Sequence, residues 1–277
     1  MNIRAKKSLG QNFLKSVSAL NKIVETAELS PNDIVLEVGP GKGALTAKIL
    51  GTGAKIFAVE KDSELISFLS EKFASEISSG QLILICDDIL SVDLSSPPYK
   101  FTRMYRFDTD GLKANTYKLL ANLPYYITGQ FLRLFLGSRN APSEMVLLLQ
   151  KEVARRIVAS DGKESVLSLS VKAYGNPKYV ETVKAKYFSP EPKVDSAIIS
   201  IKNINRDKFI GIDENLFFTI IKTAFNQKRK IAMTTLKKIA SAEILEKIWS
   251  ENQIPPTARP ENIPLEKWLV IANSIKK

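Results

Sequence analysis

Short apolar runs alternate with amphipathic segments through the first 160 residues, and this alternation is the strongest constraint on the fold. The runs are continuous, as in QLILIC and EMVLLLQ, which is typical of strands buried on both faces of a parallel sheet. Strands that alternate with helices imply such a sheet, covered by helices on both faces. We therefore predict an α/β fold. The predicted strands are 34–39, 55–60, 81–86, 117–122 and 144–150, and the predicted helices are 18–28, 44–50, 62–73, 126–136 and 151–160.

The pattern changes in the last third of the chain. Residues 179–188 and 196–204 are predicted to form a late antiparallel pair of strands, and after about residue 205 only helical periodicity remains. We therefore predict two domains, a catalytic α/β domain over 1–204 and a small all-helical domain over 205–277.

Charge and composition narrow the classes of function. The net charge is +11, and residues 201–277 carry 14 basic against 8 acidic side chains, with a cluster at Gln227-Lys-Arg-Lys230. Such a surplus favours a polyanionic partner, and the cluster points to nucleic acid. The chain has no histidine, so Ser-His, Cys-His and zinc-hydrolase chemistry are excluded, and no metal is expected. The single cysteine, Cys86, and the lack of a run of about 18 apolar residues favour a cytoplasmic protein without a membrane span.

The unusual residues of the chain follow the predicted strands, where ligands bind in open α/β sheets. The first strand is followed by Gly39-Pro-Gly41-Lys-Gly43, and glycines there allow a ligand to approach the backbone. Glu60 follows the second strand at a spacing that suits the hydroxyls of a ribose, and Asp88 follows the third, where it would accept from an adenine amino group. A dinucleotide and S-adenosylmethionine both fit these features. The G-x-G-x-G spacing, with Glu37 ahead of it, favours the methyl donor.

The fourth strand ends in Asn122-Leu123-Pro124-Tyr125. The exocyclic amine of adenine is a poor nucleophile because its lone pair is delocalised into the ring. Two carbonyl acceptors, one from the Asn122 side chain and one from the Leu123–Pro124 backbone, would draw the nitrogen toward a tetrahedral shape. Proline fixes its own φ angle and helps to hold that geometry, and Tyr125 is placed to stack on the base. Such catalysis depends on orientation and needs no strong general base.

The chain resembles the KsgA/RsmA-type small-subunit (16S) rRNA adenine N6,N6-dimethyltransferases. The resemblance implies a Rossmann-like, S-adenosylmethionine-dependent methyltransferase sheet and a small C-terminal helical domain. It implies dimethylation of two adjacent adenosines near the 3′ end of 16S rRNA in the 30S subunit, by a protein taken as a monomer. The matching segments are KKSLGQNFL at 6–14, LEVGPGKGALT at 36–46, VEKD at 59–62, DDIL at 87–90, NLPYYIT at 122–128, FSPEPKVDSAI at 188–198 and AFNQKRK at 224–230.

The resemblance also implies roles for individual residues. Phe188 would stack on the extruded adenine opposite Tyr125, and Lys228, Arg229 and Lys230 would contact rRNA phosphates. The residues expected to hold the methyl donor are Asn12, Leu14, Gly39, Gly41, Glu60, Asp88, Ile89 and Asn122.

Two other functions stay open at the level of sequence. The macrolide-resistance 23S rRNA adenine methyltransferases share the Asn-Leu-Pro-Tyr chemistry, although FSPEPKVDSAI and AFNQKRK fit the small-subunit group better. A ribosome-assembly factor with dispensable catalysis would keep the same RNA-binding features. An insert around 97–118, longer than the family usually has, is either an RNA-facing loop or a hairpin without function.

Overall fold

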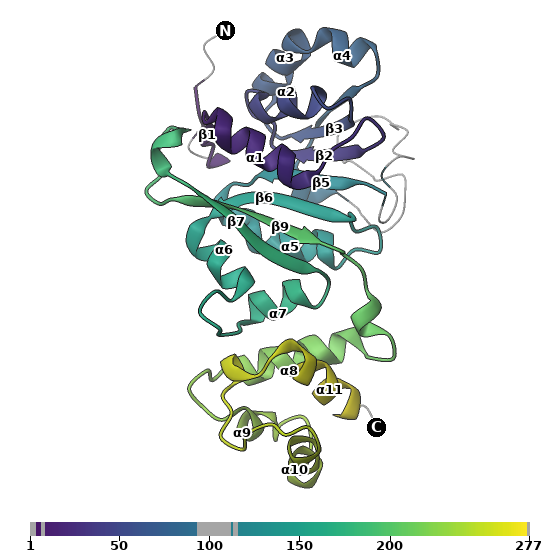
Figure 1. The fold of residues 1–277 in the computed structure, drawn as a ribbon, viewed down its shortest axis with the longest axis vertical. Helices are drawn as coiled ribbons and strands as arrows, with labels where there is room; N and C mark the ends of the chain where they lie inside the picture. Colours follow the sequence, from purple (N-terminus) through teal and green to yellow (C-terminus); the bar gives the residue numbers. More distant parts are fainter. Residues whose placement is uncertain (1–3, 7–8, 93–111, 113–115, 276–277) are drawn as a thin grey trace. The chain divides into compact units, whose positions relative to one another are not determined.

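The computed structural model describes residues 4–6, 9–92, 112 and 116–275, so the insert around 97–118 lies mostly outside the described residues. The chain divides into two compact units (Figure 1). The first comprises Met1–Ala154 and Asn176–Ile204, and the second comprises Arg155–Gly175 and Asn205–Lys277. The sequence placed residues 155–175 in the first domain, but in the structure they group with the C-terminal helices, because they pack there through the helix α7 (Val166–Lys172) and Tyr174. No helix among the described residues is long and apolar enough to cross a membrane.

A seven-stranded sheet forms the first unit, in the order β4-β3-β2-β5-β6-β9-β7. The five strands predicted from apolar runs pair in parallel, and β9 then pairs antiparallel with both β6 and β7. The predicted α/β sheet is confirmed, and the late antiparallel pair extends it. The strands are β2 (Ile34–Val38), β3 (Lys55–Glu60), β4 (Leu82–Cys86), β5 (Lys118–Asn122), β6 (Glu144–Gln150), β7 (Asn176–Val183) and β9 (Ser196–Lys202).

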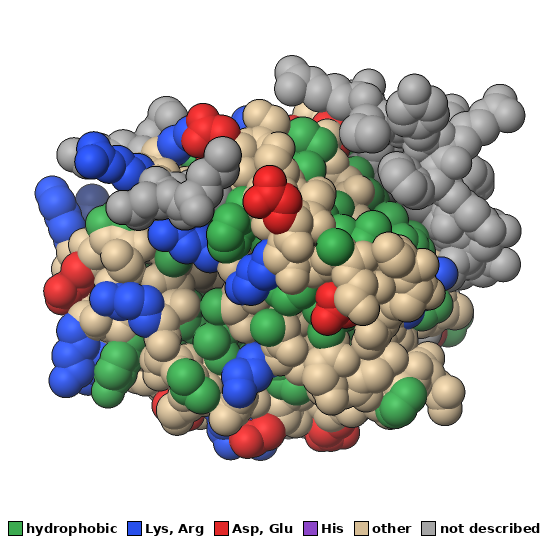
Figure 2. All heavy atoms as spheres, turned by 90° about the horizontal axis from the view of Figure 1, so that it is seen from above, with side chains coloured by type: hydrophobic (Ala, Val, Ile, Leu, Met, Phe, Trp, Pro, Cys, Tyr) green, Lys and Arg blue, Asp and Glu red, His purple; other side chains and the backbone are tan. Residues whose placement is uncertain are grey.

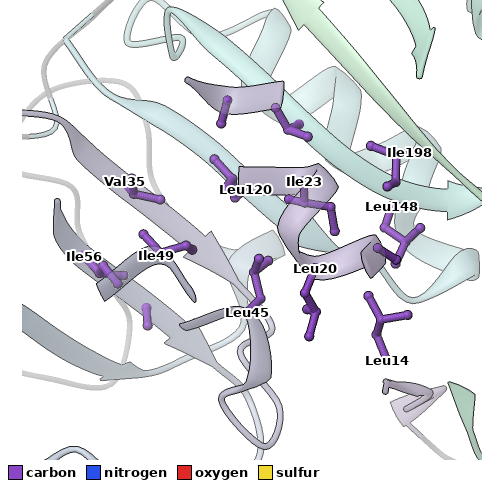
Figure 3. Packing of buried hydrophobic residues seen from close by; sticks show 14 of the residues in the cluster. Leu14, Leu20, Ile23, Val35, Leu45, Ile49, Ile56, Leu120, Leu148 and Ile198 are labelled. Carbon is purple, nitrogen blue, oxygen red and sulfur yellow. The ribbon is translucent and has the colours of Figure 1, made fainter. Parts of the chain in front are cut away.

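Both faces of this sheet are buried, as its continuous apolar strands require. Alternate residues of a strand face opposite sides, and the neighbours Val35 and Leu36 of β2 are both fully buried. On one face α1 and α2 pack against the strands, and Figure 3 shows Leu20 and Ile23 of α1 among Leu120 and Leu148. The helices and turns of this unit are α1 (Val17–Ala27), α2 (Ala44–Leu50), α3 (Ser63–Lys72), α4 (Ala74–Ser78), η2 (Ile89–Ser91), η3 (Tyr125–Ile127), α5 (Thr128–Leu136) and η4 (Ala185–Tyr187), together with the start of α6 (Lys151–Val158).

A two-stranded sheet brings distant parts of the sequence together. The strand β1 (Phe13–Leu14) pairs antiparallel with β8 (Phe188–Ser189), so that Leu14 lies opposite Phe188. The backbone N–H of Lys15 extends the contact by donating to the carbonyl of Tyr187 at 2.8 Å. The motif segments 6–14 and 188–198 are therefore neighbours in space, which no local pattern in the sequence indicates.

The second unit is helical and has its own aromatic core. Rings of Tyr174, Phe209, Phe217 and Phe218 contact one another, and Trp268 is fully buried against Phe225. Among its helices α7 was not predicted from the sequence. The elements of this unit, after the end of α6, are α7 (Val166–Lys172), η5 (Asp207–Phe209), α8 (Glu214–Phe225), α9 (Ala232–Leu236), α10 (Ala242–Glu251), η6 (Pro260–Asn262) and α11 (Leu265–Ile275).

Candidate active site

The carboxyl ends of β2, β3, β4 and β5 meet at one edge of the sheet and line a single cavity. The space between its atoms is about 940 Å³, counting the part open to solvent. The predicted site residues that line the cavity are Asn12, Gly39, Gly41, Glu60, Asp88, Ile89, Asn122, Leu123, Pro124, Tyr125 and Phe188. Leu14 does not line it, since its side chain is buried in the core and lines a second, adjoining cavity.

The glycine loop after β2 requires its glycines. Gly39 and Gly41 have φ angles of +71° and +59°, a region that side chains disfavour. A Cβ atom on Gly41 would also stand 3.0 Å from the ring of Phe13. At Gly39 and Gly41 the loop therefore exposes main-chain atoms to the cavity, which Phe13 of the N-terminal segment also lines.

Glu60 ends β3 with its carboxylate fixed by backbone donors. Its Oε1 accepts from the N–H of Asp62 at 2.9 Å, and its Oε2 accepts from the N–H of Gly41 at 3.2 Å. Burial raises the pKa of this carboxyl, and hydrogen bonds from the backbone of Asp62, Gly41 and Lys61 oppose the shift. Because a carboxylate has about four acceptor sites, these backbone donors do not exhaust its capacity to accept from a ligand hydroxyl.

Asp88 and Ile89 stand at the end of the neighbouring strand β4. Asp88 caps η2 by accepting from the N–H of Leu90 at 3.0 Å, and its other oxygen pairs with Lys61 at 2.8 Å. Burial alone would raise the pKa of Asp88, but the Lys61 ammonium holds it below its usual range. Ile89 is buried and supplies apolar wall to the cavity.

Asn122 ends β5 and is tied to the N-terminal segment. Its Nδ2 donates to the backbone carbonyl of Asn12 at 3.1 Å, which occupies the donor end of the amide and leaves the acceptor end for another group. The carbonyl of Pro124 accepts from the N–H of Ile127 at 3.2 Å, within the turn η3. The geometry thus favours the Leu123 carbonyl, rather than that of Pro124, as the second acceptor beside Asn122.

Aromatic side chains also line the cavity. The hydroxyl of Tyr125 is 2.9 Å from Ser196 Oγ, and burial raises its pKa. The Phe188 ring lines the cavity but is only 2% exposed, and it belongs to the core beside Leu14. Tyr126, not predicted as a site residue, also lines the cavity and is 67% exposed.

A polar network that the sequence did not indicate holds the N-terminal segment beside the cavity. Asp62 accepts from Lys6 Nζ at 2.7 Å and from Gln11 Nε2 at 3.1 Å. Burial alone would raise the pKa of Asp62, but these partners hold it below its usual range. Asp62 also donates its N–H to Glu60, so one short loop connects the N-terminal segment with the buried carboxylate.

Glu37 lies on β2, behind the glycine loop, and is 1% exposed. Neither of its carboxyl oxygens has a hydrogen-bond partner among the described residues. Burial raises its pKa from 4.5 to about 8, and the charge of Glu60 acts in the same direction. The Thr46 hydroxyl opposes the shift, although no hydrogen bond of regular geometry joins the two side chains.

The three basic residues predicted to bind RNA lie in the second unit and line neither cavity. Lys228, Arg229 and Lys230 are exposed in the turn after α8, which the N–H of Lys230 closes by donating to the Gln227 carbonyl at 2.8 Å. None of the three takes part in an ion pair among the described residues. The cluster is an exposed turn rather than part of a helix face.

Comparison with known families agrees with this arrangement. The model of the family described as ribosomal RNA adenine dimethylase matches residues 2–277. The chain belongs to this family. Two similar relatives are both named ribosomal RNA small subunit methyltransferase A. One, from Dehalococcoides mccartyi strain CBDB1, is 38% identical over 96% of this chain and 87% of its own length. The other, from Fusobacterium nucleatum, is 37% identical over 97% of both chains.

Solved structures of similar proteins support the fold assignment. A dimethyladenosine transferase from Plasmodium falciparum has a TM-score of 0.71 at 24% identity, covering 94% of this chain and 95% of that one. The 23S rRNA methyltransferase ErmE has a TM-score of 0.74 at 22% identity, covering 96% of this chain and all of that one. The predicted fold, a Rossmann-like sheet with a C-terminal helical region, is thereby confirmed.

Proposed function

We propose that this protein transfers methyl groups from S-adenosylmethionine to N6 of two adjacent adenosines near the 3′ end of 16S rRNA in the 30S subunit. The product is N6,N6-dimethyladenosine, and the reaction belongs to small-subunit biogenesis in the cytoplasm, with the protein acting as a monomer. One observation carries the proposal. Asn122, its amide oriented by Asn12, stands with the Leu123 carbonyl and Tyr125 in the same cavity as Glu60 and Asp88.

The residues at the strand ends suit S-adenosylmethionine, which supplies an electrophilic methyl group when bound. Glu60 offers two fixed acceptor oxygens for the two ribose hydroxyls. Asp88 accepts from the adenine amine, while Ile89 contacts the ring as apolar wall. The glycine loop at Gly39 and Gly41 lets the ligand approach the backbone.

The acceptor side of the cavity activates an adenine by orienting it. In the first transfer the Asn122 amide oxygen and the Leu123 carbonyl would accept from the two N–H bonds of the exocyclic amine and direct its lone pair toward the donor; in the second transfer one N–H bond remains. In each transfer the bond from N6 to the methyl carbon would form as the S–CH₃ bond breaks, S-adenosylhomocysteine would leave, and the N6 proton would pass to water. Tyr125 and Phe188 hold the base between them by stacking. Orientation of this kind lowers barriers by up to roughly 7–11 kcal/mol in well-aligned systems, so no histidine is needed.

The choice of 16S over 23S rRNA rests on sequence similarity. The relatives that are 37–38% identical carry the small-subunit name, whereas ErmE, at 22% identity, shares the fold. The segments FSPEPKVDSAI and AFNQKRK point the same way. A ribosome-assembly factor without catalysis would have no use for the oriented Asn122.

The deciding experiment is methyl transfer from labelled S-adenosylmethionine to 30S subunits that lack the dimethyladenosines, with 50S subunits in parallel. We expect label on 30S rRNA, recovered as N6,N6-dimethyladenosine. Label on 50S subunits alone would instead identify an enzyme of the resistance type. Binding to 30S subunits without any transfer would identify an assembly factor.

A further inference from the structure

A second cavity adjoins the candidate active site. The space between its atoms is about 1010 Å³, counting the part open to solvent, and it shares Phe13, Gly39, Gly41 and Asn122 with the first cavity. Residues of α1, the glycine loop, α2, the end of α3 and the β1–β8 pair form its remaining walls. A group bound there would lie directly beside the point at which the proposed methyl transfer takes place.

The two cavities differ sharply in charge. The first is lined by three acidic side chains, Glu60, Asp87 and Asp88, and by one lysine, Lys61. The second has no Asp or Glu among its lining residues but contains three lysines, Lys15, Lys42 and Lys72. Seen from above (Figure 2), Lys and Arg side chains gather on the left of the molecule, the side on which Figure 1 shows β1. The chemistry of this cavity therefore suits an anion.

The three lysines have no carboxylate partners in the described part of the chain. Lys72 Nζ donates to the backbone carbonyl of Lys42 at 2.9 Å and lies 4.9 Å from the centre of the Phe73 ring. Lys42 Nζ lies 5.0 Å from the centre of the Phe13 ring. These contacts with a carbonyl and with aromatic faces place the Lys42 and Lys72 ammonium groups at the cavity without neutralising them.

Two anionic groups can reach this cavity during the reaction. One is the carboxylate of the donor, which Leu14 in its wall is expected to help to hold, and the other is a phosphate of the RNA, at the end of the nucleotide away from N6. The amino-acid end of S-adenosylmethionine is a zwitterion, and the second cavity offers no acidic lining residue to its ammonium. A phosphodiester carries negative charge only, and lysines bind phosphates as point charges. The charge pattern thus favours the phosphate.

We propose that this second cavity binds a backbone phosphate of the rRNA strand next to the target adenosine. The inference rests on the proposed function. Nucleotides of one strand are covalently joined, so a base held at Asn122 brings its flanking phosphates to the neighbouring surface. Phosphate contacts of this kind position a nucleic acid without reading its sequence. They would fix which adenosine of the strand enters the active site.

The test compares two variants that each remove three charges from the first unit. One carries Lys15→Gln, Lys42→Gln and Lys72→Gln. The matched control carries Lys48→Gln, Lys55→Gln and Lys178→Gln, which lie outside both cavities. For each protein we would measure affinity for unmethylated 30S subunits across a salt series, affinity for S-adenosylmethionine by calorimetry, methyl transfer to 30S rRNA, and the thermal midpoint of unfolding.

We expect the cavity variant to bind 30S subunits about fivefold or more weakly than the control, with a log–log salt slope smaller by about 0.7 for each single-strand phosphate that the variant no longer neutralises. Its donor affinity and thermal midpoint should match those of the control. Weaker donor binding with an unchanged salt slope would overturn the inference and assign the lysines to the donor carboxylate. Identical behaviour of the two variants would also overturn it. The wild-type protein separates the two proposals, because absence of transfer by the wild type counts against the function itself, not against the cavity.

Discussion

The side-chain amide of Asn122 donates a hydrogen bond to the backbone carbonyl of Asn12 at 3.1 Å, across 110 positions of sequence. An amide has one donor end and one acceptor end, so this bond decides which end faces a ligand. The N-terminal segment therefore takes part in orienting the residue proposed to activate the target amine.

We expect Asn122→Asp to be nearly as inactive as Asn122→Ala, although aspartate has the same size as asparagine. A carboxylate cannot donate to the Asn12 carbonyl and would be repelled by it. Loss of one oriented polar group from an active site typically lowers kcat by about 100- to 1000-fold. Single-turnover methyl transfer to 30S subunits measures the loss, and binding of 30S subunits is the control. Near-normal transfer by the aspartate variant would show that the amide orientation is unimportant.

Glu60→Gln tests the two acceptor oxygens at the end of β3. The amide keeps the size of the side chain but turns its NH₂ group toward one of the backbone donors, Gly41 or Asp62, each of which now donates to Glu60. Hydrogen bonds to a charged group contribute about 1.5–3 kcal/mol, so we expect roughly 10- to 150-fold weaker binding of S-adenosylmethionine. Isothermal titration measures this affinity. An unchanged dissociation constant would remove Glu60 from the donor site.

Glu37 makes the free energy of unfolding depend on pH. Its pKa is about 8 in the folded chain against an ordinary value of 4.5. The folded state therefore binds more protons than the unfolded state between these two values, and the free energy of unfolding falls as the pH rises through that window. The full effect of this one group is roughly 5 kcal/mol.

We expect Glu37→Gln to abolish most of that dependence and to be more stable than the wild type at pH 8, because a neutral amide removes the cost of burying a charge. Urea unfolding between pH 5 and pH 9 measures the difference. Glu71→Gln, at an exposed position on α3, is the control. Parallel curves for the wild type and Glu37→Gln would mean that Glu37 does not titrate in this range.

The predicted strands and helices of the sheet match the structure because their sequences carry the signal locally. Residues 55–60 form β3 without any change of bounds, and 34–39, 81–86 and 117–122 each differ by one residue. Strand-end residues such as Glu60 and Asn122 were also predictable, since the carboxyl ends of parallel strands meet at one edge. The sequence did not reveal α7, which is only seven residues long and is closed by a capping box of two serines, Ser165 and Ser168.

Contacts between segments that are distant in the sequence could not be predicted from local sequence patterns. The contact of β1 with β8, the Asp62 network with Lys6 and Gln11, and the attachment of β9 to β6 each join distant segments. Phe188 illustrates the consequence. The motif placed it in the site, but only the fold shows that its ring is also buried core.

Two variants of Tyr125 distinguish the contribution of its ring, which stacks, from that of its hydroxyl, which forms a hydrogen bond. Tyr125→Phe keeps the ring and removes the hydrogen bond between the hydroxyl and Ser196, so we expect less than about a tenfold decrease in methyl transfer. Tyr125→Ala removes the ring, and base–aromatic stacking contributes about 1–3 kcal/mol, which corresponds to roughly 5- to 150-fold. Rates measured with saturating donor would distinguish the two variants. Equal decreases would place the function of Tyr125 in its hydroxyl.

The exposed turn after α8 tests the proposed contact with rRNA in the second unit. Lys228→Ala with Arg229→Ala should weaken 30S binding and lower the log–log salt slope, by about 0.7 to 0.9 for each phosphate that the turn neutralises in the wild type. Neither side chain has an ion-pair partner among the described residues, so the folded unit should keep its stability. Lys237→Ala with Lys238→Ala removes an adjacent exposed pair from the same unit and serves as the control. If both double variants retain the wild-type slope, the turn is solvated surface and the rRNA binds elsewhere on the molecule.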